Sequence, residues 1–209
     1  MNEISKQNSN YMSLSGNHVN NESTLLPDNK ALIFSGKEQI NYERIPYPMM
    51  EDNKGAIVRT IVSGLCGSDL HPYHCKEECA VGSSFGHEAV VTIVKVGSNV
   101  KDETMICGSQ KFVVPFSTAC GDCYFCTELK VSARCVNSRL FGWKDPTTNE
   151  GLNGCQSLYF YVPNCENTLF PLSPELSVEE GLLIGDIATT ALYAAVQVKY
   201  KVTDDCINI

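Results

Sequence analysis

Four cysteines in one short segment constrain this chain more than any other feature. Cys120, Cys123 and Cys126 recur at every third position, and Cys135 follows one loop later. Four thiolates at such spacing can close a tetrahedron around zinc, which accepts sulfur ligands at about 2.3 Å and imposes no geometry of its own. Disulfides and an iron–sulfur cluster are the alternatives, but the cluster spacing with a trailing proline is missing from the sequence. We therefore predict a lobe around structural zinc over residues 117–142.

The cellular compartment bears on the same choice, because disulfides are rare where thiols stay reduced. The first residues contain no apolar signal-peptide core, so we predict a cytoplasmic protein in which the eleven cysteines indicate metal or redox chemistry. A net charge of −8 leaves no basic surface for nucleic acid. Apolar stretches such as Ala188 to Val198 are too short for a membrane span. Neither nucleic acid nor a membrane is an expected partner.

The chain divides into a polar tail and one folded domain. Residues 1–29 are rich in Asn, Ser and Glu, and this composition predicts disorder. From Lys30, short apolar or alternating runs bounded by turn residues predict strands at 31–34, 40–45, 56–62, 89–96, 112–114 and 158–162. Several short strands with little helix between them favour a mainly β barrel or sandwich.

Helices are predicted only near the end of the chain. Ser177 and Glu180 have the spacing of a capping box, which predicts a helix through Gly181 to Ile184. A second helix is expected from Asp186 to about Val198. Residues 205–209 look like the opening of a strand.

Two further motifs contain candidate catalytic groups: Gly64-Leu65-Cys66-Gly67-Ser68-Asp69-Leu70-His71 and Gly86-His87-Glu88. Together with the cysteine lobe, they resemble the zinc-containing medium-chain alcohol dehydrogenase family over about Lys30 to Ile209. The resemblance implies one GroES-like domain over residues 30–209, a partly open β-barrel with a structural zinc lobe and two late helices.

The resemblance also implies a ligand set for a second, catalytic zinc. Cys66 and His87 match two of the family ligands, and Asp186 stands at the position of the third. An Asp there is similar to the formaldehyde dehydrogenase-like and threonine or polyol dehydrogenase-like branches. A carboxylate oxygen is an established zinc ligand, so the substitution is compatible with metal binding.

Three other residues receive roles from the resemblance. Ser68 and His71 match a relay that carries the substrate hydroxyl proton to solvent, which suits a hydroxyl beside a metal and an imidazole that titrates near neutrality. Glu88 matches a residue behind the metal that acts as a transient ligand or supports the ligands. The implied reaction is hydride transfer between a small alcohol or aldehyde and NAD or NADP.

The sequence contains no recognisable motif for binding a dinucleotide. No Gly-x-Gly-x-x-Gly follows a predicted strand, so we expect the chain to end at the first strand of an absent Rossmann domain and to be inactive alone. A homo-oligomer, or a second chain that supplies the nucleotide-binding domain, is the corresponding expected partner. The alternative is a non-catalytic zinc-binding remnant, or a subunit completed by another chain.

Cys75 and Cys79 flank the charged turn Lys76-Glu77-Glu78. They are compatible with a redox pair, an additional metal site or ordinary loop thiols, and the last of these is the simplest interpretation.

Overall fold

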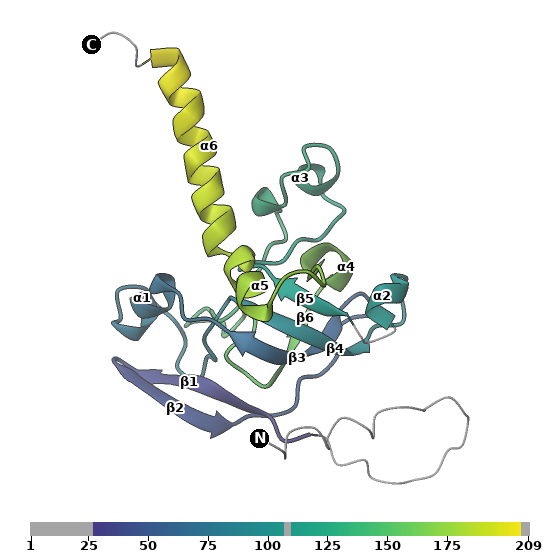
Figure 1. Cartoon of the computed structure of the whole chain (residues 1–209). Helices are drawn as coiled ribbons and strands as arrows, with labels where there is room; N and C mark the ends of the chain where they lie inside the picture. The colour runs from purple at the N-terminus through teal and green to yellow at the C-terminus, as the bar shows by residue number, and fades with distance from the viewer. Residues whose placement is uncertain (1–26, 107–109, 206–209) are drawn as a thin grey trace, which may run out of the picture.

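The structure is a computed structural model that describes residues 27–106 and 110–205, and it contains two antiparallel sheets (Figure 1). The smaller sheet is a hairpin of β1 (Lys30–Gly36) and β2 (Gln39–Arg44). The larger sheet has the strand order β6-β3-β4-β5-β7. Its strands, in chain order, are β3 (Ala56–Ser63), β4 (Ala89–Val96), β5 (Lys111–Val114), β6 (Tyr159–Val162) and β7 (Phe170–Pro171).

Backbone hydrogen bonds join the hairpin to segments beside the larger sheet. The amide of Leu32 donates to the carbonyl of Gln156 at 3.0 Å, and the amide of Phe34 donates to Ser83 at 2.9 Å. Isolated bridges at Ala31–Ser157 and Ile33–Ser84 accompany them. The hairpin is therefore held beside the larger sheet, but the strands of the described residues do not close into a complete barrel.

Alternate residues of β4 explain how the larger sheet is buried on both faces. Ala89, Val91 and Ile93 belong to the main core, whereas Val90 points to the opposite face. Successive side chains of a strand point to opposite faces of the sheet. A strand in which both odd and even positions are apolar must therefore be covered on both faces. On the second face that cover includes α5 (Val178–Gly185), which packs Val178 and Leu182 near Val90.

The position of α5 depends on its first turn and on its two glycines. The Ser177 hydroxyl accepts from the Glu180 amide at 3.2 Å, and the Glu180 carboxylate accepts from the Ser177 amide at 2.8 Å, which confirms the predicted capping box. A Cβ added at Gly185 would lie 2.7 Å from the carbonyl oxygen of Val114, and one at Gly181 would collide with Leu172. The absence of these side chains lets α5 approach the sheet closely and brings Asp186 to the end of β5.

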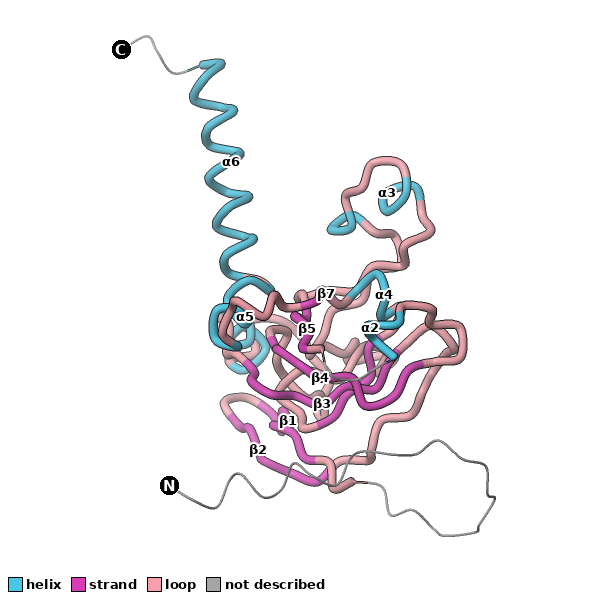
Figure 2. Tube along the Cα trace, turned by 45° about the vertical axis from the view of Figure 1, so that its right-hand side comes forward, coloured by secondary structure: helices cyan, strands magenta, loops and turns pink. Residues whose placement is uncertain are grey.

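The last helix, α6 (Ile187–Asp205), extends away from the sheets (Figures 1 and 2). It continues past the predicted end at Val198, because no Gly or Pro interrupts the sequence from Ile187 to Asp205. The predicted strand is therefore wrong at Asp205, which is helical, while residues 206–209 lie outside the described part. Within residues 27–106 and 110–205, no single helix is long and apolar enough to cross a membrane; α5 and α6 to Val198 meet those limits only as a pair bent by 49°.

The six predicted strands and both late helices are confirmed, with small changes at their ends apart from the longer α6. Short helical segments that the apolar patterns did not predict are η1 (Gly67–Asp69), α1 (Leu70–Tyr73), α2 (Glu103–Ile106), α3 (Tyr124–Thr127), η2 (Ser132–Arg134) and α4 (Cys165–Thr168). They escape a periodicity argument because each is a single turn. Asn29, at the end of the predicted tail, packs against the folded domain. The buried Asn29 side chain donates to the Tyr159 carbonyl at 2.9 Å and accepts from its amide at 3.0 Å, and residues 1–26 lie outside the described part.

Candidate metal centres and substrate pocket

The cysteine lobe projects from the sheet on a narrow base (Figure 2). An antiparallel bridge pairs Ser117 with Leu140, and the Thr118 amide donates to the Arg139 carbonyl at 3.0 Å, so the lobe begins and ends at adjacent backbone positions. Beyond this base the segment contains only the single turns α3 and η2. A loop with so little regular structure and apolar contact needs another source of order.

The four lobe cysteines supply a donor set for that purpose. Their sulfur atoms all lie within 4.8 Å of one another, with Cys135–Cys120 at 3.4 Å and Cys123–Cys126 at 3.6 Å. Sulfur atoms bound to one tetrahedral zinc at about 2.3 Å lie about 3.7 Å apart. The arrangement therefore fits a zinc ion with small shifts of the side chains.

The charges of the lobe thiols also favour a bound cation. Hydrogen bonding from the Val136 backbone lowers the pKa of Cys123 to about 6, whereas desolvation raises the pKa of the buried Cys120. One thiolate forms readily, but several negative sulfurs in contact would repel one another. A bound cation removes that repulsion, which is why a closed zinc site holds its cysteines as thiolates.

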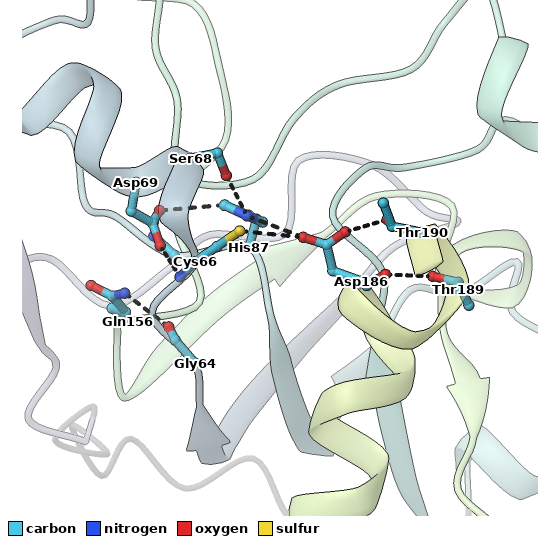
Figure 3. Close-up of polar contacts among 10 residues, drawn as sticks. Gly64, Cys66, Ser68, Asp69, His87, Gln156, Asp186, Thr189 and Thr190 are labelled. Atoms are coloured by element: carbon cyan, nitrogen blue, oxygen red, sulfur yellow. Dashed lines mark hydrogen bonds and ion pairs between the residues drawn. The ribbon is translucent and has the colours of Figure 1, made fainter. Parts of the chain in front are cut away.

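A second cluster lies between η1, β4 and the start of α6 (Figure 3). Cys66, His87, Glu88 and Asp186 each offer a ligand atom within 4.8 Å of the others. Oδ2 of Asp186 is 3.6 Å from Sγ of Cys66 and also 3.6 Å from Nε2 of His87. These separations are those of ligands around one tetrahedral ion with bonds of about 2.0–2.3 Å, so the sulfur, nitrogen and oxygen donors fit zinc.

Asp69 is a site residue that the motif analysis did not single out. Its side chain is only 6% exposed, and Oδ2 accepts from the Cys66 amide at 2.9 Å while Oδ1 lies 3.3 Å from Nδ1 of His87. Burial opposes a charged imidazole, but the hydrogen bonding and charge of Asp69, together with those of Cys66, raise the pKa of His87 to about 9. The sequence signal was a carboxylate three residues after Cys66, the position from which a side chain can cap the turn that starts there.

Glu88 completes the acidic surroundings of the cluster. It is 9% exposed, and burial together with the neighbouring Asp186 carboxylate raises its pKa. A Cβ at Gly64 would collide with the Glu88 carboxylate, so Gly64 leaves the space that this side chain occupies. Several acids around one imidazole make the cluster attractive to a cation.

The structure brings the two predicted relay residues to one region but does not join them. Oγ of Ser68 lies 3.1 Å from Nε2 of His87, whereas His71 lies 3.3 Å from Glu77. No hydrogen bond links Ser68 to His71 in the described part of the chain. The relay therefore stays a prediction that requires the Ser68 hydroxyl to turn away from His87.

A pocket of about 340 Å³ opens beside the second cluster. Its polar wall contains Ser68, Asp69, Glu77, His87, Asp186 and Thr190. Its apolar wall contains Pro72, Phe116, Leu140, Phe141 and Trp143. A mostly apolar cavity with a few convergent polar groups is typical of small-molecule sites.

The fold and the two clusters define a class of protein, a mainly antiparallel β domain with two candidate metal centres and a pocket beside one of them. The family described as the alcohol dehydrogenase GroES-like domain matches residues 52–174 of this sequence. The chain therefore belongs to the alcohol dehydrogenase GroES-like domain family, which confirms the resemblance drawn from the motifs and the GroES-like fold.

Individual relatives support the same conclusion. The chain is 37% identical to the medium chain reductase/dehydrogenase ucsI of Acremonium sp. over 169 residues, which cover 80% of this chain and 54% of the relative. It is 32% identical to zinc-type alcohol dehydrogenase B of Aspergillus flavus over 166 residues, covering 79% and 36%. The solved structure of alcohol dehydrogenase TADH from Thermus sp. ATN1 is similar at a TM-score of 0.74 and 32% identity, covering 80% of this chain and 47% of that one. The chain thus spans about half the length of these relatives or less.

Proposed function

We propose that residues 30–209 form the zinc-binding catalytic domain of an alcohol or aldehyde dehydrogenase. The observation that carries the proposal is the convergence of Cys66, His87 and Asp186 beside an apolar pocket, whose wall includes His87 and Asp186. These residues come from separate elements, and Asp186 is 120 residues from Cys66 in the sequence. Three ligating side chains of the types that zinc prefers, beside a cavity, are an arrangement suited to catalysis rather than to packing.

Each residue of the cluster has a distinct part in this proposal. Cys66, His87 and Asp186 would hold a catalytic zinc, and three protein ligands leave one position open for the substrate. Bound zinc polarises a hydroxyl oxygen and eases the loss of its proton. Asp69 accepts the Nδ1 proton of His87, which leaves Nε2 free to bind metal. Glu88 lies behind the ligands as a transient ligand or a counter-charge.

Ser68 and His71 are proposed to carry the substrate proton to solvent. Ser68 lines the pocket, so its hydroxyl can accept a proton there and pass on its own. His71 is 52% exposed, which suits exchange with water. The path requires Ser68 to exchange its contact with His87 for one toward His71.

The complete reaction also needs a hydride acceptor, for which we propose NAD or NADP. The relatives named above include dehydrogenases, but this chain spans only part of their length. We propose that a nucleotide-binding domain, in a longer chain or in a second subunit, completes the site. Without one, the chain would lose the orientation that can contribute about 7–11 kcal/mol in well-aligned reactions, so we expect no detectable turnover from residues 1–209 alone.

A non-catalytic zinc-binding module is the second candidate. The cysteine lobe favours it, because four ligands around one point form a closed site that stabilises structure and performs no reaction. The two candidates differ in the number of zinc ions, since only the first requires a second ion at Cys66, His87 and Asp186.

Metal analysis of purified variants separates these candidates. We expect two zinc ions per chain in the unmodified protein. Cys66→Ala should retain one zinc ion, in the cysteine lobe. Cys123→Ala should also retain one, at the Cys66 cluster, as long as the domain stays folded without the lobe zinc. Circular dichroism of each variant checks that the fold is intact. A single zinc that survives Cys66→Ala and is lost with Cys123→Ala would reject the catalytic proposal and leave the zinc-binding module.

A further inference from the structure

We infer that the pocket beside Cys66, His87 and Asp186 accepts an uncharged alcohol or aldehyde with an aromatic body, and that Glu77 excludes anionic analogues. The inference rests on the proposed function, because it names the substrate class of the same site. It concerns the recognition of the substrate body, however, and can be measured by binding without any hydride transfer.

The shape and lining of the pocket favour a single ring. Phe116, Leu140 and Trp143 form an apolar wall, and the volume of about 340 Å³ lies at the lower end of the range of about 300–1,000 Å³ for small-molecule sites. Aromatic rings prefer offset or edge contacts with other rings, which Phe116 and Trp143 offer. A one-carbon substrate would leave most of this wall in contact with water.

The charges around the pocket disfavour an anion. None of the residues that line it in the described part of the chain is Lys or Arg. A divalent metal would be balanced by the Cys66 thiolate and the Asp186 carboxylate, and Asp69 is paired with His87. Glu77 is then the acid on the pocket wall that contacts no metal ligand, and its ionisable neighbour is the half-exposed His71 ring at 3.3 Å.

The main-chain segment that carries Glu77 is anchored on both sides. On one side, the Lys76 amide donates to the His71 carbonyl at 2.8 Å, and Oε1 of Glu77 lies 3.3 Å from the His71 ring. On the other side, the indole of Trp143 donates to the Glu78 carbonyl at 2.9 Å. Trp143 therefore has two roles, as pocket wall and as anchor of the segment that holds the charge beside it.

A matched pair of carboxylates makes the test specific. Glu77 lines this pocket and also a second cavity, whereas its neighbour Glu78 lines the second cavity alone and contributes its carbonyl to Trp143. Glu77→Gln and Glu78→Gln change the net charge equally. Any effect confined to Glu77→Gln must therefore act at short range.

The probes are benzyl alcohol and 4-(hydroxymethyl)benzoate, titrated into the zinc-loaded chain. Trp143 is the single tryptophan, so its fluorescence reports binding in the pocket, and calorimetry gives an independent Kd. We expect benzyl alcohol to bind and the benzoate to bind at least about fivefold more weakly. A unit charge about 5 Å away in a largely aqueous dielectric changes affinity by about fivefold, so Glu77→Gln should recover about that factor for the benzoate alone. Glu78→Gln should change neither Kd.

Three results would overturn the inference: equal affinities for the two probes, equal effects of the two Glu→Gln variants, or no binding of benzyl alcohol. Zinc analysis of the same samples separates this failure from that of the proposed function. If the samples contain two zinc ions but do not bind the probes, the proposed metal centres are supported and the aromatic substrate class is rejected.

Discussion

The carboxylate of Asp69 lies 3.3 Å from Nδ1 of His87 and so determines which ring nitrogen faces Cys66 and Asp186. Partners of this kind orient a metal-binding imidazole, and their removal typically weakens metal affinity by about 10–100-fold. We therefore expect Asp69→Asn to lower the zinc affinity of the Cys66 cluster within that range. Chelator competition on the zinc-loaded protein would measure it. Asp28→Asn, in a surface pair with Arg44, is the control and should leave zinc affinity unchanged.

The same pairing predicts how the metal-free cluster responds to pH. The Asp69 carboxylate raises the pKa of His87 to about 9, against an ordinary value of 6.5. A raised folded-state pKa contributes stability that is complete below pH 6.5 and is lost as the pH rises through about 9. NMR titration of His87 in chelated protein should give a pKa near 9 that falls in Asp69→Asn. An unchanged His87 pKa in that variant would contradict the assignment.

Asp186 can be tested against its simplest structural role, a cap at the start of α6. Its side chain accepts from the Thr190 hydroxyl at 2.9 Å, a contact that an amide oxygen can also make. Asn caps helices about as well as Asp, so Asp186→Asn should hardly change the unfolding temperature. The amide lacks the negative charge, however, and we expect the zinc of the Cys66 cluster to bind more weakly while the lobe zinc is retained. Unchanged affinity for both ions would reject Asp186 as a ligand.

Gly185 should be as important for the cluster as a ligand, although it contacts no metal. A Cβ there would lie 2.7 Å from the Val114 carbonyl, so Gly185→Ala must displace α5 or β5 and with it Asp186. Overpacking of this kind costs about 1–3 kcal/mol of stability. Gly67→Ala is the control, because a Cβ at Gly67 meets nothing within 4 Å although the residue follows Cys66 directly. Thermal unfolding and zinc content should change in the first variant only.

Removal of metal should affect the lobe before the sheets. The helices of the segment 117–142 are single turns, so we expect its order to depend on a metal bound by the four cysteines. Structural zinc sites in small peptides contribute about 10–16 kcal/mol, so chelation should sharply increase hydrogen exchange across residues 117–142. Exchange in β3 and β4 should rise much less. Equal increases in the lobe and in these strands would mean that the lobe zinc supports the whole domain.

The sequence alone determined the local elements and the chemical types at the two candidate centres. The nearly continuous apolar run of β4 and the Ser177–Glu180 capping box specify a strand and a helix start, because both depend on neighbours within a few positions. The spacing of Cys120, Cys123 and Cys126 likewise predicted the lobe cluster, since a short loop can close around a metal with few long-range contacts. The end of α6 was misplaced because nothing local marks a stop near Val198.

Only the tertiary structure decided which distant groups meet. Asp186 reaches Cys66 because Gly181 and Gly185 let α5 lie close to the sheet, and such packing depends on residues far apart in the sequence. The place of Asp69 beside His87, and of Glu77 on the pocket wall, has the same origin. A side chain's type is written in the sequence, but its partners depend on how strands and helices pack, because a hydrogen bond or metal site requires atoms a few ångströms apart.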